Sequence, residues 1–369
     1  MTKIKVVSIS ILTLLLLFSC KEKKAKNVLK KETYIPRVIK NITLKKFDHT
    51  KFGLKNLSSI RAIELVDSTA FFIGEKGKIY GFYPNGNFLI TPNDFFGNKT
   101  PNFRASGRSK NSLYALSIGS PTLLYQITMN SKDGLINPKL VYTEKHEKAF
   151  YDAMAFFDTQ NGIAIGDPTD NCLSIIITRD GGNSWQKISC DKLPKLTEGE
   201  AAFAASNTNI SIVGKNAWII TGGIQSRVLH TNDMGKSWNI YHTPLINGKE
   251  STGAYSVDFF DTKNGIICGG DYTNKTRDKA NKAITTDGGK TWKLVADGQY
   301  PGYISCVQYI PNTNGKELVA VSTEGIYFSN NSGISWIRVN DEGYFAIKFI
   351  DENTAWLAGN GKIAKMILE

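Results

Sequence analysis

A repeated eight-residue pattern, Ser/Thr-x-Asp/Asn-x-Gly-x-x-Trp, constrains the fold more than any other feature of this sequence. Four of the six tryptophans end a copy of it, and they are spaced 53, 54 and 44 residues apart. Self-similarity at such a period is typical of an array of similar supersecondary units. The copies span residues 178–185, 231–238, 285–292 and 329–336. Their defining residues are Asp180, Trp185, Asp233, Trp238, Asp287, Trp292, Asn331 and Trp336.

The chemistry of this pattern is that of a tight turn between two strands. A short Asp or Asn side chain accepts hydrogen bonds from nearby backbone N–H groups, and Gly adopts a positive φ at no steric cost. We therefore expect the carboxylate to hold its own turn, because its oxygens are occupied locally. The alternative is a carboxylate that remains available to a ligand or a metal.

A second motif precedes the first. Residues 154–166 read MAFFDTQNGIAIG and residues 257–269 read VDFFDTKNGIICG, with fainter copies at 63–74 and 347–359. Alternating apolar residues on both sides of an Asp/Asn turn predict a strand, a turn and a second strand. The second motif followed by the first predicts a meander of four strands.

Seven such units can be counted, beginning near Ile60, Phe103, Tyr151, Ala201, Tyr255, Ile304 and Phe345. About 330 residues divided by seven give about 47 residues per unit, a normal length for one propeller blade. The sequence thus predicts an all-β, seven-bladed propeller of four-stranded blades over residues 41–369. The unit at 102–145 lacks the turn pattern. Residues 42–47 are expected to supply the missing strand of the last blade, which removes open sheet edges.

The two motifs in this order, with Trp-bearing turns, resemble the photosystem II stability/assembly factor family and its bacterial lipoprotein relatives. The turn pattern resembles the Asp-box of bacterial neuraminidase repeats. The resemblance covers roughly residues 57–369 and implies a propeller used as an assembly or binding platform. It implies neither a photosystem partner nor a redox cofactor for this chain.

The first residues resemble the signal of an exported lipoprotein. Lys3 and Lys5 precede a mainly apolar run of thirteen residues at 6–18, which is too short for a membrane-spanning helix. The run ends in Ser19-Cys20, like a lipobox, so residues 1–19 are expected to be removed and Cys20 to be acylated. Residues 20–40 would then form a basic, flexible tether that favours an anionic lipid surface. We expect a monomer that is lipid-anchored to the cell envelope, on its periplasmic or outer face.

The net charge of the chain and its cysteines restrict the possible partners and cofactors further. Cleavage would remove two lysines and lower the formal charge from +12 to +10, and much of the remainder lies on the tether. We therefore expect no nucleic-acid partner. Cys172 and Cys190 are symmetric about a predicted turn and are expected to form a disulfide, whereas Cys268 and Cys306 could be oxidised or free. No zinc, Walker or dinucleotide motif is present, and no metal or cofactor is expected.

Propeller topology places the start of each innermost strand and each loop between the second and third strands on one face. The Asp-boxes mark the opposite face. We expect polar residues from seven units to converge there in a funnel that binds a protein or a polar or anionic ligand. The predicted funnel residues are Arg61, Arg104, Tyr151, Asp152, Asp167, Glu200, Arg227 and Asp271.

Two functions were compatible with such a funnel. The first is a non-catalytic binding or assembly platform, which we favour. The second is a glycan-active enzyme similar to sialidases, in which Asp152, Glu200 and Tyr255 would be catalytic. That alternative requires two carboxylates across one scissile bond, and the Arg-Ile-Pro motif of sialidases is absent, with only Ile60-Arg61-Ala62 in its place.

Overall fold

The computed structural model describes residues 34–39, 41–110, 112–130 and 134–369. Residues Ile35–Glu369 form one compact unit, here called the propeller body. The predicted signal peptide, the predicted lipidation site Cys20 and the tether up to residue 33 lie outside the described residues. Within the described ranges, no helix combines the length and apolar character needed to cross a membrane.

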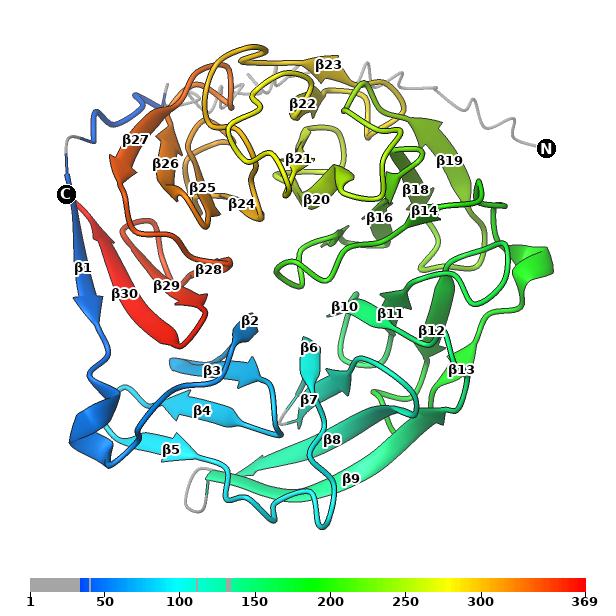
Figure 1. The fold of residues 1–369 in the computed structure, drawn as a ribbon, viewed down its shortest axis with the longest axis vertical. Helices are drawn as coiled ribbons and strands as arrows, with labels where there is room; N and C mark the ends of the chain where they lie inside the picture. The colour runs from blue at the N-terminus through cyan, green and yellow to red at the C-terminus, as the bar shows by residue number, and fades with distance from the viewer. Residues whose placement is uncertain (1–33, 40, 111, 131–133) are drawn as a thin grey trace, which may run out of the picture. The chain divides into compact units, whose positions relative to one another are not determined.

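Seven antiparallel sheets surround a central opening in the propeller body, so the predicted seven-bladed all-β propeller is confirmed (Figure 1). The first three blades contain β2 (Ile60–Val66), β3 (Thr69–Gly74), β4 (Ile79–Phe82) and β5 (Phe88–Ile90); β6 (Phe103–Ser109), β7 (Ser112–Ser117), β8 (Thr122–Asn130) and β9 (Gly134–Glu144); and β10 (Tyr151–Phe156), β11 (Gly162–Gly166), β12 (Ser174–Thr178) and β13 (Gln186–Lys187). The second blade thus forms four regular strands without an Asp-box.

The remaining blades follow the same order from the centre outward (Figure 1). They contain β15 (Ile210–Val213), β16 (Asn216–Ile220), β18 (Arg227–Thr231) and β19 (Asn239–His242); β20 (Thr252–Phe259), β21 (Gly265–Asp271), β22 (Lys282–Thr285) and β23 (Lys293–Leu294); β24 (Cys306–Tyr309), β25 (Leu318–Ser322), β26 (Gly325–Ser329) and β27 (Ile337–Asn340); and β28 (Ala346–Phe349), β29 (Thr354–Gly359), β30 (Lys362–Leu368) and β1 (Ile42–Lys46). Two short 3-10 helices, His49–Phe52 and Cys190–Lys192, lie in connections.

The last blade is closed by the first strand of the chain, as predicted. β1 pairs antiparallel with β30, from Ile42 opposite Leu368 to Lys46 opposite Ala364. The segment before β1 also packs on the body: Ile39 is 3% exposed in the core shared by the sixth and seventh blades. Arg37 pairs with Glu317 at 2.6 Å. The end of the expected tether is therefore docked, and the body extends N-terminal of residue 41.

The fourth blade departs from the prediction. Its innermost strand was expected to begin near Ala201, but it is β15, which begins at Ile210. Residues Glu200–Ala201 instead form β14, which pairs with β17 (Gly222–Gly223), and β17 joins β20, so the fifth sheet has six strands. Residues 202–208, here called the plug segment, belong to no strand. Apart from Phe203 its side chains are small or polar and lack strand alternation, and Ser206, Asn207 and Thr208 form hydrogen bonds to other blades.

The Asp-boxes connect the third and fourth strands of their blades. Asp180 Oδ1 accepts hydrogen bonds from Ser184 N at 3.0 Å and Thr178 Oγ1 at 2.8 Å, and Oδ2 accepts one from Ser184 Oγ at 2.6 Å. Asp233 and Asp287 make the same contacts in their own turns. The carboxylates are thus used within the turns, as the composition of the motif indicated.

The Asp-boxes also fasten neighbouring blades together. Tyr114 Oη in the second blade donates to Gly181 O at 2.5 Å, and Trp218 Nε1 in the fourth donates to Gly288 O at 2.8 Å. Gly182 has a φ of +89°, and a Cβ there would lie 2.3 Å from Tyr114 Oη. The core lies between blades, because seven apolar clusters each join residues of two adjacent blades.

Cys172 and Cys190 form a disulfide across the hairpin of the third blade, with Cα atoms 5.7 Å apart. Cys268 and Cys306 are buried free thiols. Burial raises the pKa of Cys268 to about 12, so the sulfur stays protonated and unreactive at neutral pH.

Candidate funnel on the face opposite the Asp-boxes

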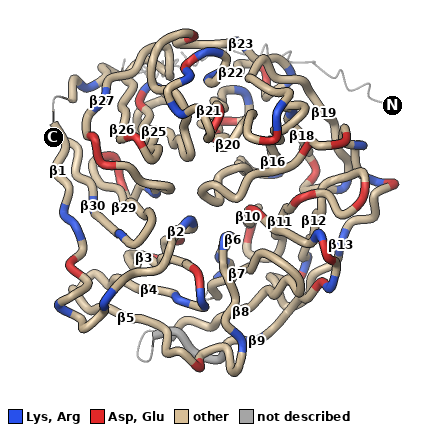
Figure 2. Tube along the Cα trace, viewed as in Figure 1, with Lys and Arg blue, Asp and Glu red and all other residues tan. Residues whose placement is uncertain are grey.

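A cavity of about 510 Å³ lies among the starts of the innermost strands, on the face opposite the Asp-boxes. Five residues singled out in the sequence line this cavity: Arg61, Arg104, Asp152, Asp167 and Tyr255. We call it the funnel. Basic positions on β2 and β6 and an acidic position on β10 lie at the central opening (Figure 2). Residues separated by almost 200 positions are thus brought together by the closure of the ring.

Two adjacent guanidinium groups form one wall of the funnel. Arg61 Nη1 donates to Ala205 O at 3.0 Å, and its Cζ lies 4.0 Å from the centre of the Phe345 ring. Arg104 Nη2 donates to Glu75 Oε1 at 2.7 Å. The Nε atoms of both arginines are buried and have no hydrogen-bond partner among the described residues. Each guanidinium therefore has donor capacity left for an incoming acceptor.

Burying the positive charges of these two guanidinium groups costs free energy. Burial, followed by repulsion from Arg104, lowers the pKa of Arg61 to about 10. Burial also lowers the pKa of Arg104, while Glu75 opposes that shift. Both groups stay protonated at neutral pH, so an anionic ligand would relieve the repulsion between them.

Two carboxyl groups form the facing wall. Asp152 is 0% exposed, and neither of its side-chain oxygens has a hydrogen-bond partner in the described part of the chain. Burial and the neighbouring Asp167 raise the pKa of Asp152 well above its ordinary value. Burial raises the pKa of Asp167 to about 6, although its Oδ1 accepts a hydrogen bond from Ala202 N at 3.1 Å. Both pKa shifts favour the neutral carboxyl form.

Aromatic side chains complete the funnel. The Tyr255 ring stacks on Phe203 at 4.2 Å and 11°, and Tyr303 lies edge-on to it at 5.0 Å. Tyr272 is 47% exposed at the rim. The Tyr255 hydroxyl donates to Ser251 O at 2.7 Å, so this proton is already used within the protein. Burial raises the pKa of Tyr303 to about 12.

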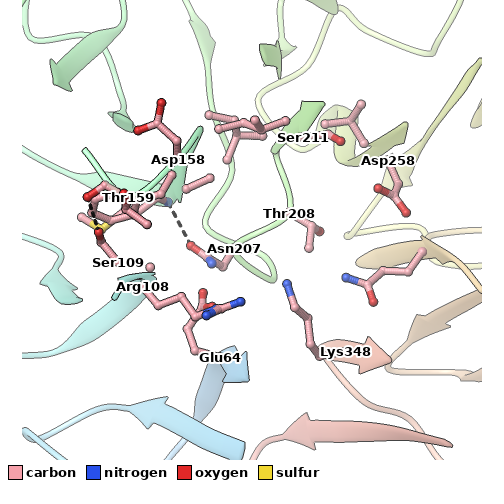
Figure 3. A pocket seen from close by; sticks show the side chains of 18 of the residues that line it. Glu64, Arg108, Ser109, Asp158, Thr159, Asn207, Thr208, Ser211, Asp258 and Lys348 are labelled. Atoms are coloured by element: carbon pink, nitrogen blue, oxygen red, sulfur yellow. Dashed lines mark hydrogen bonds between the residues drawn. The ribbon is translucent and has the colours of Figure 1, made fainter. Parts of the chain in front are cut away.

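The plug segment forms the floor of the funnel by bridging several blades. Ser206 Oγ donates to Ser305 O at 2.7 Å. Asn207 Oδ1 accepts from Ser106 N at 3.2 Å and Met154 N at 3.0 Å, and its carboxamide reaches the centre of the ring (Figure 3). The central channel is thus divided into the funnel and a second chamber on the Asp-box face.

Four predicted funnel residues lie elsewhere. Glu200 Oε1 and Oε2 accept from Arg227 Nε at 3.0 and 3.1 Å, and Glu200 lines a separate cavity of about 700 Å³. The Tyr151 hydroxyl donates to Glu144 Oε2 at 2.8 Å in the interior. Asp271 Oδ1 accepts from Thr273 N at 2.9 Å and holds a turn. The displacement of the fourth innermost strand explains why Glu200 and Arg227 miss the funnel.

Comparison with known proteins indicates which protein family this chain resembles. The model of the family described as photosynthesis system II assembly factor YCF48 matches residues 140–249, which contain the first two Asp-boxes. Over these residues the chain resembles the photosystem II assembly factor-like β-propellers. The solved structure of YCF48 bound to a D1 peptide aligns with a TM-score of 0.61 at 11% identity, over 91% of this chain and all of that one.

Structural likeness by itself establishes only the propeller fold. YCF48 from Cyanidioschyzon merolae gives a TM-score of 0.59 at 14% identity, covering 88% of this chain and 98% of the other. The WD40 repeats of RRP9 align equally well, at 0.60 and 12% identity over 91% of this chain and all of theirs. No curated protein matches the chain in sequence. The resemblance to photosystem II assembly factor-like propellers therefore depends on the family match at residues 140–249 and on the sequence repeats.

The residues that line the second chamber were not among the site residues predicted from the sequence. Glu64, Asp258 and Lys348 occupy the same place in the second motif, directly after its first apolar residue, and all three line that chamber. The alternation of apolar and polar residues could have identified these positions. A residue directly after the first apolar residue of a strand points to the opposite face of the sheet, away from the apolar core. The described residues contain no cluster of three His, Cys, Asp or Glu side chains suited to a metal ion.

Proposed function

We propose that this protein is a non-catalytic binding platform whose funnel receives a polypeptide segment of a partner protein through an acidic group. The observation that carries the proposal is the pair of half-buried arginines Arg61 and Arg104, which line one cavity and whose Nε atoms have no hydrogen-bond partner among the described residues. A carboxylate matches a guanidinium in charge and in planar, two-pronged geometry. The aromatic wall offers stacking area beside it, as protein-binding sites commonly do.

The structure of a similar propeller supports a role in binding polypeptide segments. YCF48 has been solved with a bound D1 peptide, so a propeller of this fold can hold a polypeptide segment. The funnel, at about 510 Å³, has room for a few residues of an extended chain rather than for a folded domain.

The geometry gives little support to the alternative of a glycan-active enzyme. Asp152 and Glu200 line different cavities, and Glu200 is ion-paired with Arg227. The Tyr255 hydroxyl is engaged by Ser251. Hydrolysis needs two carboxyl groups on opposite sides of one bond, and this pair of acids does not share a cavity.

The test compares three forms of the full-length protein as bait in envelope extracts: the native chain, the Arg61→Ala/Arg104→Ala double variant, and Arg277→Ala. Arg277 is exposed on the funnel face but does not line the funnel, so it controls for loss of one positive charge. The captured protein is identified, and a synthetic peptide of its contacting segment is titrated against each form. We expect at least tenfold weaker peptide binding by the double variant only. Equal binding by all three forms would contradict the proposal, provided thermal unfolding shows that each is folded.

We further propose that the platform is anchored to the cell envelope by acylation of Cys20. The supporting observation is the N-terminal sequence, in which an apolar run of signal-peptide length ends in Ser19-Cys20 and is followed by lysines. Mass spectrometry of the mature protein should find a diacyl or triacyl N-terminal cysteine. The Cys20→Ala variant should leave the membrane fraction, and membrane retention of that variant would argue against lipid anchoring.

A further inference from the structure

We propose that the chamber on the Asp-box face of the channel is a second binding site, for a small zwitterionic molecule that carries one ammonium group and one carboxylate. It lies across the plug segment from the funnel. The inference is independent of the proposed function, because it uses none of the funnel residues.

The chamber is a built cavity rather than a gap between blades. Its volume is about 470 Å³, and it lies among the inner strands of the ring beneath Asn207 of the plug segment (Figure 3). This size suits a molecule between an amino acid and a short peptide. Hydroxyl and amide groups of Thr208, Ser211 and Gln308 line it and could orient such a ligand.

Six charged residues line this chamber, of which Lys110 and Asp158 are exposed and Asp158 holds its own turn. The remaining four comprise two of each sign. The acids are Glu64 on β2 and Asp258 on β20, and the bases are Arg108 on β6 and Lys348 on β28 (Figure 3). Within the described residues, none of the four forms an ion pair, and the two basic groups make no hydrogen bond to the protein. Arg108 is exposed at the mouth of the chamber, and Lys348 and Asp258 are half-buried. Buried charges without an ion-pair partner, such as that of Glu64, are uncommon, because desolvation is costly unless something pairs with them.

The two acids are incompletely stabilised by the protein. Glu64 is 8% exposed, and its Oε1 accepts one hydrogen bond, from Ser106 Oγ at 3.2 Å. Asp258 accepts from Tyr309 N at 2.7 Å and from Phe259 N at 3.0 Å. Burial raises the pKa of Asp258 to about 6 and also raises that of Glu64, although Lys348 opposes both shifts. A ligand ammonium group would add to the partial counter-charge that Lys348 provides.

The balance of signs selects a zwitterion over an ion of one sign. The four side chains sum to a formal charge of zero, with acids on the first and fifth blades and bases on the second and seventh. An anion drawn to Lys348 would also meet Glu64 and Asp258, and a cation would meet both bases. A molecule carrying both groups can pair each end with its opposite.

The test is calorimetric titration of the full-length protein with three probes: the dipeptide alanyl-alanine, succinate and putrescine. Alanyl-alanine carries both charges, whereas the other two carry one sign each. We expect alanyl-alanine to bind at least tenfold more tightly than either ion. Absence of alanyl-alanine binding at millimolar concentration, or equal or tighter binding of an ion, would overturn the proposal.

Variants locate the binding. Glu64→Gln keeps an acceptor for Ser106 and removes the charge, and Lys348→Met removes a side chain without hydrogen bonds; each should weaken dipeptide binding at least tenfold. Lys263→Met, an exposed lysine outside the chamber, is the matched control and should bind normally. The Arg61→Ala/Arg104→Ala variant should also bind normally. Unchanged binding by both chamber variants, or loss with the funnel variant, would overturn the site, with thermal unfolding confirming that each variant folds.

Discussion

Asp152 illustrates how closing the ring changes the chemistry of a single side chain. Its carboxyl group is fully buried, and its oxygens lack hydrogen-bond partners among the described residues. An ionised carboxylate in such a place is strongly disfavoured, and the neighbouring Asp167 increases the penalty. Residues of this kind often mark functional positions, because stability alone would not retain them.

This burial predicts a pH-dependent effect of Asp152→Asn on stability. A carboxyl whose pKa is raised by folding binds its proton more tightly in the folded state, so its contribution to the free energy of unfolding falls as pH rises from the unfolded pKa through the folded one. For Asp167 that window runs from 3.8 to about 6, and the pKa of Asp152 is raised in the same direction. We expect Asp152→Asn to raise the free energy of unfolding at pH 8 by about 1–3 kcal/mol, with little effect at pH 4.

Urea denaturation at pH 4, 6 and 8 would measure this difference. Asp158→Asn is the matched control, because hydrogen bonds from Gln160 N and Asn161 lower the pKa of Asp158. The control should lose stability at pH 8. A stabilisation by Asp152→Asn that does not vary with pH would show that its buried carboxyl carries no such penalty.

The residue scale is also where sequence reasoning was weakest. Arg61, Arg104 and Asp152 could be placed at the funnel because each lies near the start of an innermost strand. Glu200 could not be placed correctly, since residues 202–208 read AFAASNT and follow the predicted strand start at Ala201, but they form the plug segment. Only contacts with distant blades, such as Ser206 to Ser305, distinguish the two outcomes.

At the scale of elements, the Asp-box is a self-contained turn that sequence chemistry predicted well. The Asx side chain, the Gly with positive φ and the Trp each act within eight residues, so no distant information is needed. The fourth copy shows that the turn also forms with Asn in place of Asp. Asn331 Oδ1 accepts from Ser335 N at 2.9 Å, and its Nδ2 donates to Ser335 Oγ at 2.8 Å, where the other copies use Asp.

This comparison predicts different outcomes for two substitutions of Asp233. Asp233→Ala removes four hydrogen-bond contacts to Thr231, Lys236 and Ser237 and should lower the free energy of unfolding by about 1–2 kcal/mol. Asp233→Asn should cost much less, because it can reproduce the contacts of Asn331. Guanidinium denaturation at pH 7 would measure both, and equal losses would contradict the proposed role of the side chain as an acceptor within the turn.

Acidic pH should remove part of the contribution that the Asp233 carboxylate makes to the free energy of unfolding. Burial is the largest single influence and opposes ionisation, but the hydrogen bonds from Ser237, Thr231 and Lys236 together outweigh it and lower the pKa of Asp233 to about 2. The stabilisation of a carboxyl with a lowered pKa is present above the unfolded value and is lost as pH falls from 3.8 towards about 2.

At the scale of the whole molecule, the ring is held closed from both ends of the chain. β1 completes the last blade, and the segment before it inserts Ile39 into the core between the sixth and seventh blades. The motifs predicted the closing strand, because residues 42–47 alternate and the last unit lacks a strand. They did not predict the docking of Ile39, because the short segment around it, which also contains Ile35 and Val38, has no periodic pattern.

Ile39 therefore offers a test of closure. Ile39→Ala should lower the free energy of unfolding by about 2–4 kcal/mol, as for other buried large-to-small substitutions. Val38→Ala, at a neighbouring side chain that is 77% exposed, should change it by less than about 0.5 kcal/mol. Denaturant unfolding of the full-length variants would measure both values, and similar small losses would show that the N-terminal segment does not hold the ring.

The central claim, that the funnel face receives a polypeptide, is tested most directly by site-specific photo-crosslinking in the envelope. A photoreactive phenylalanine analogue replaces Tyr272 at the rim of the funnel, or Ile334, which is 57% exposed in an Asp-box turn on the opposite face. We expect a defined protein adduct from position 272 that disappears in the Arg61→Ala/Arg104→Ala background, and none from position 334. An adduct formed only from position 334, or one from position 272 that does not depend on the arginines, would contradict it.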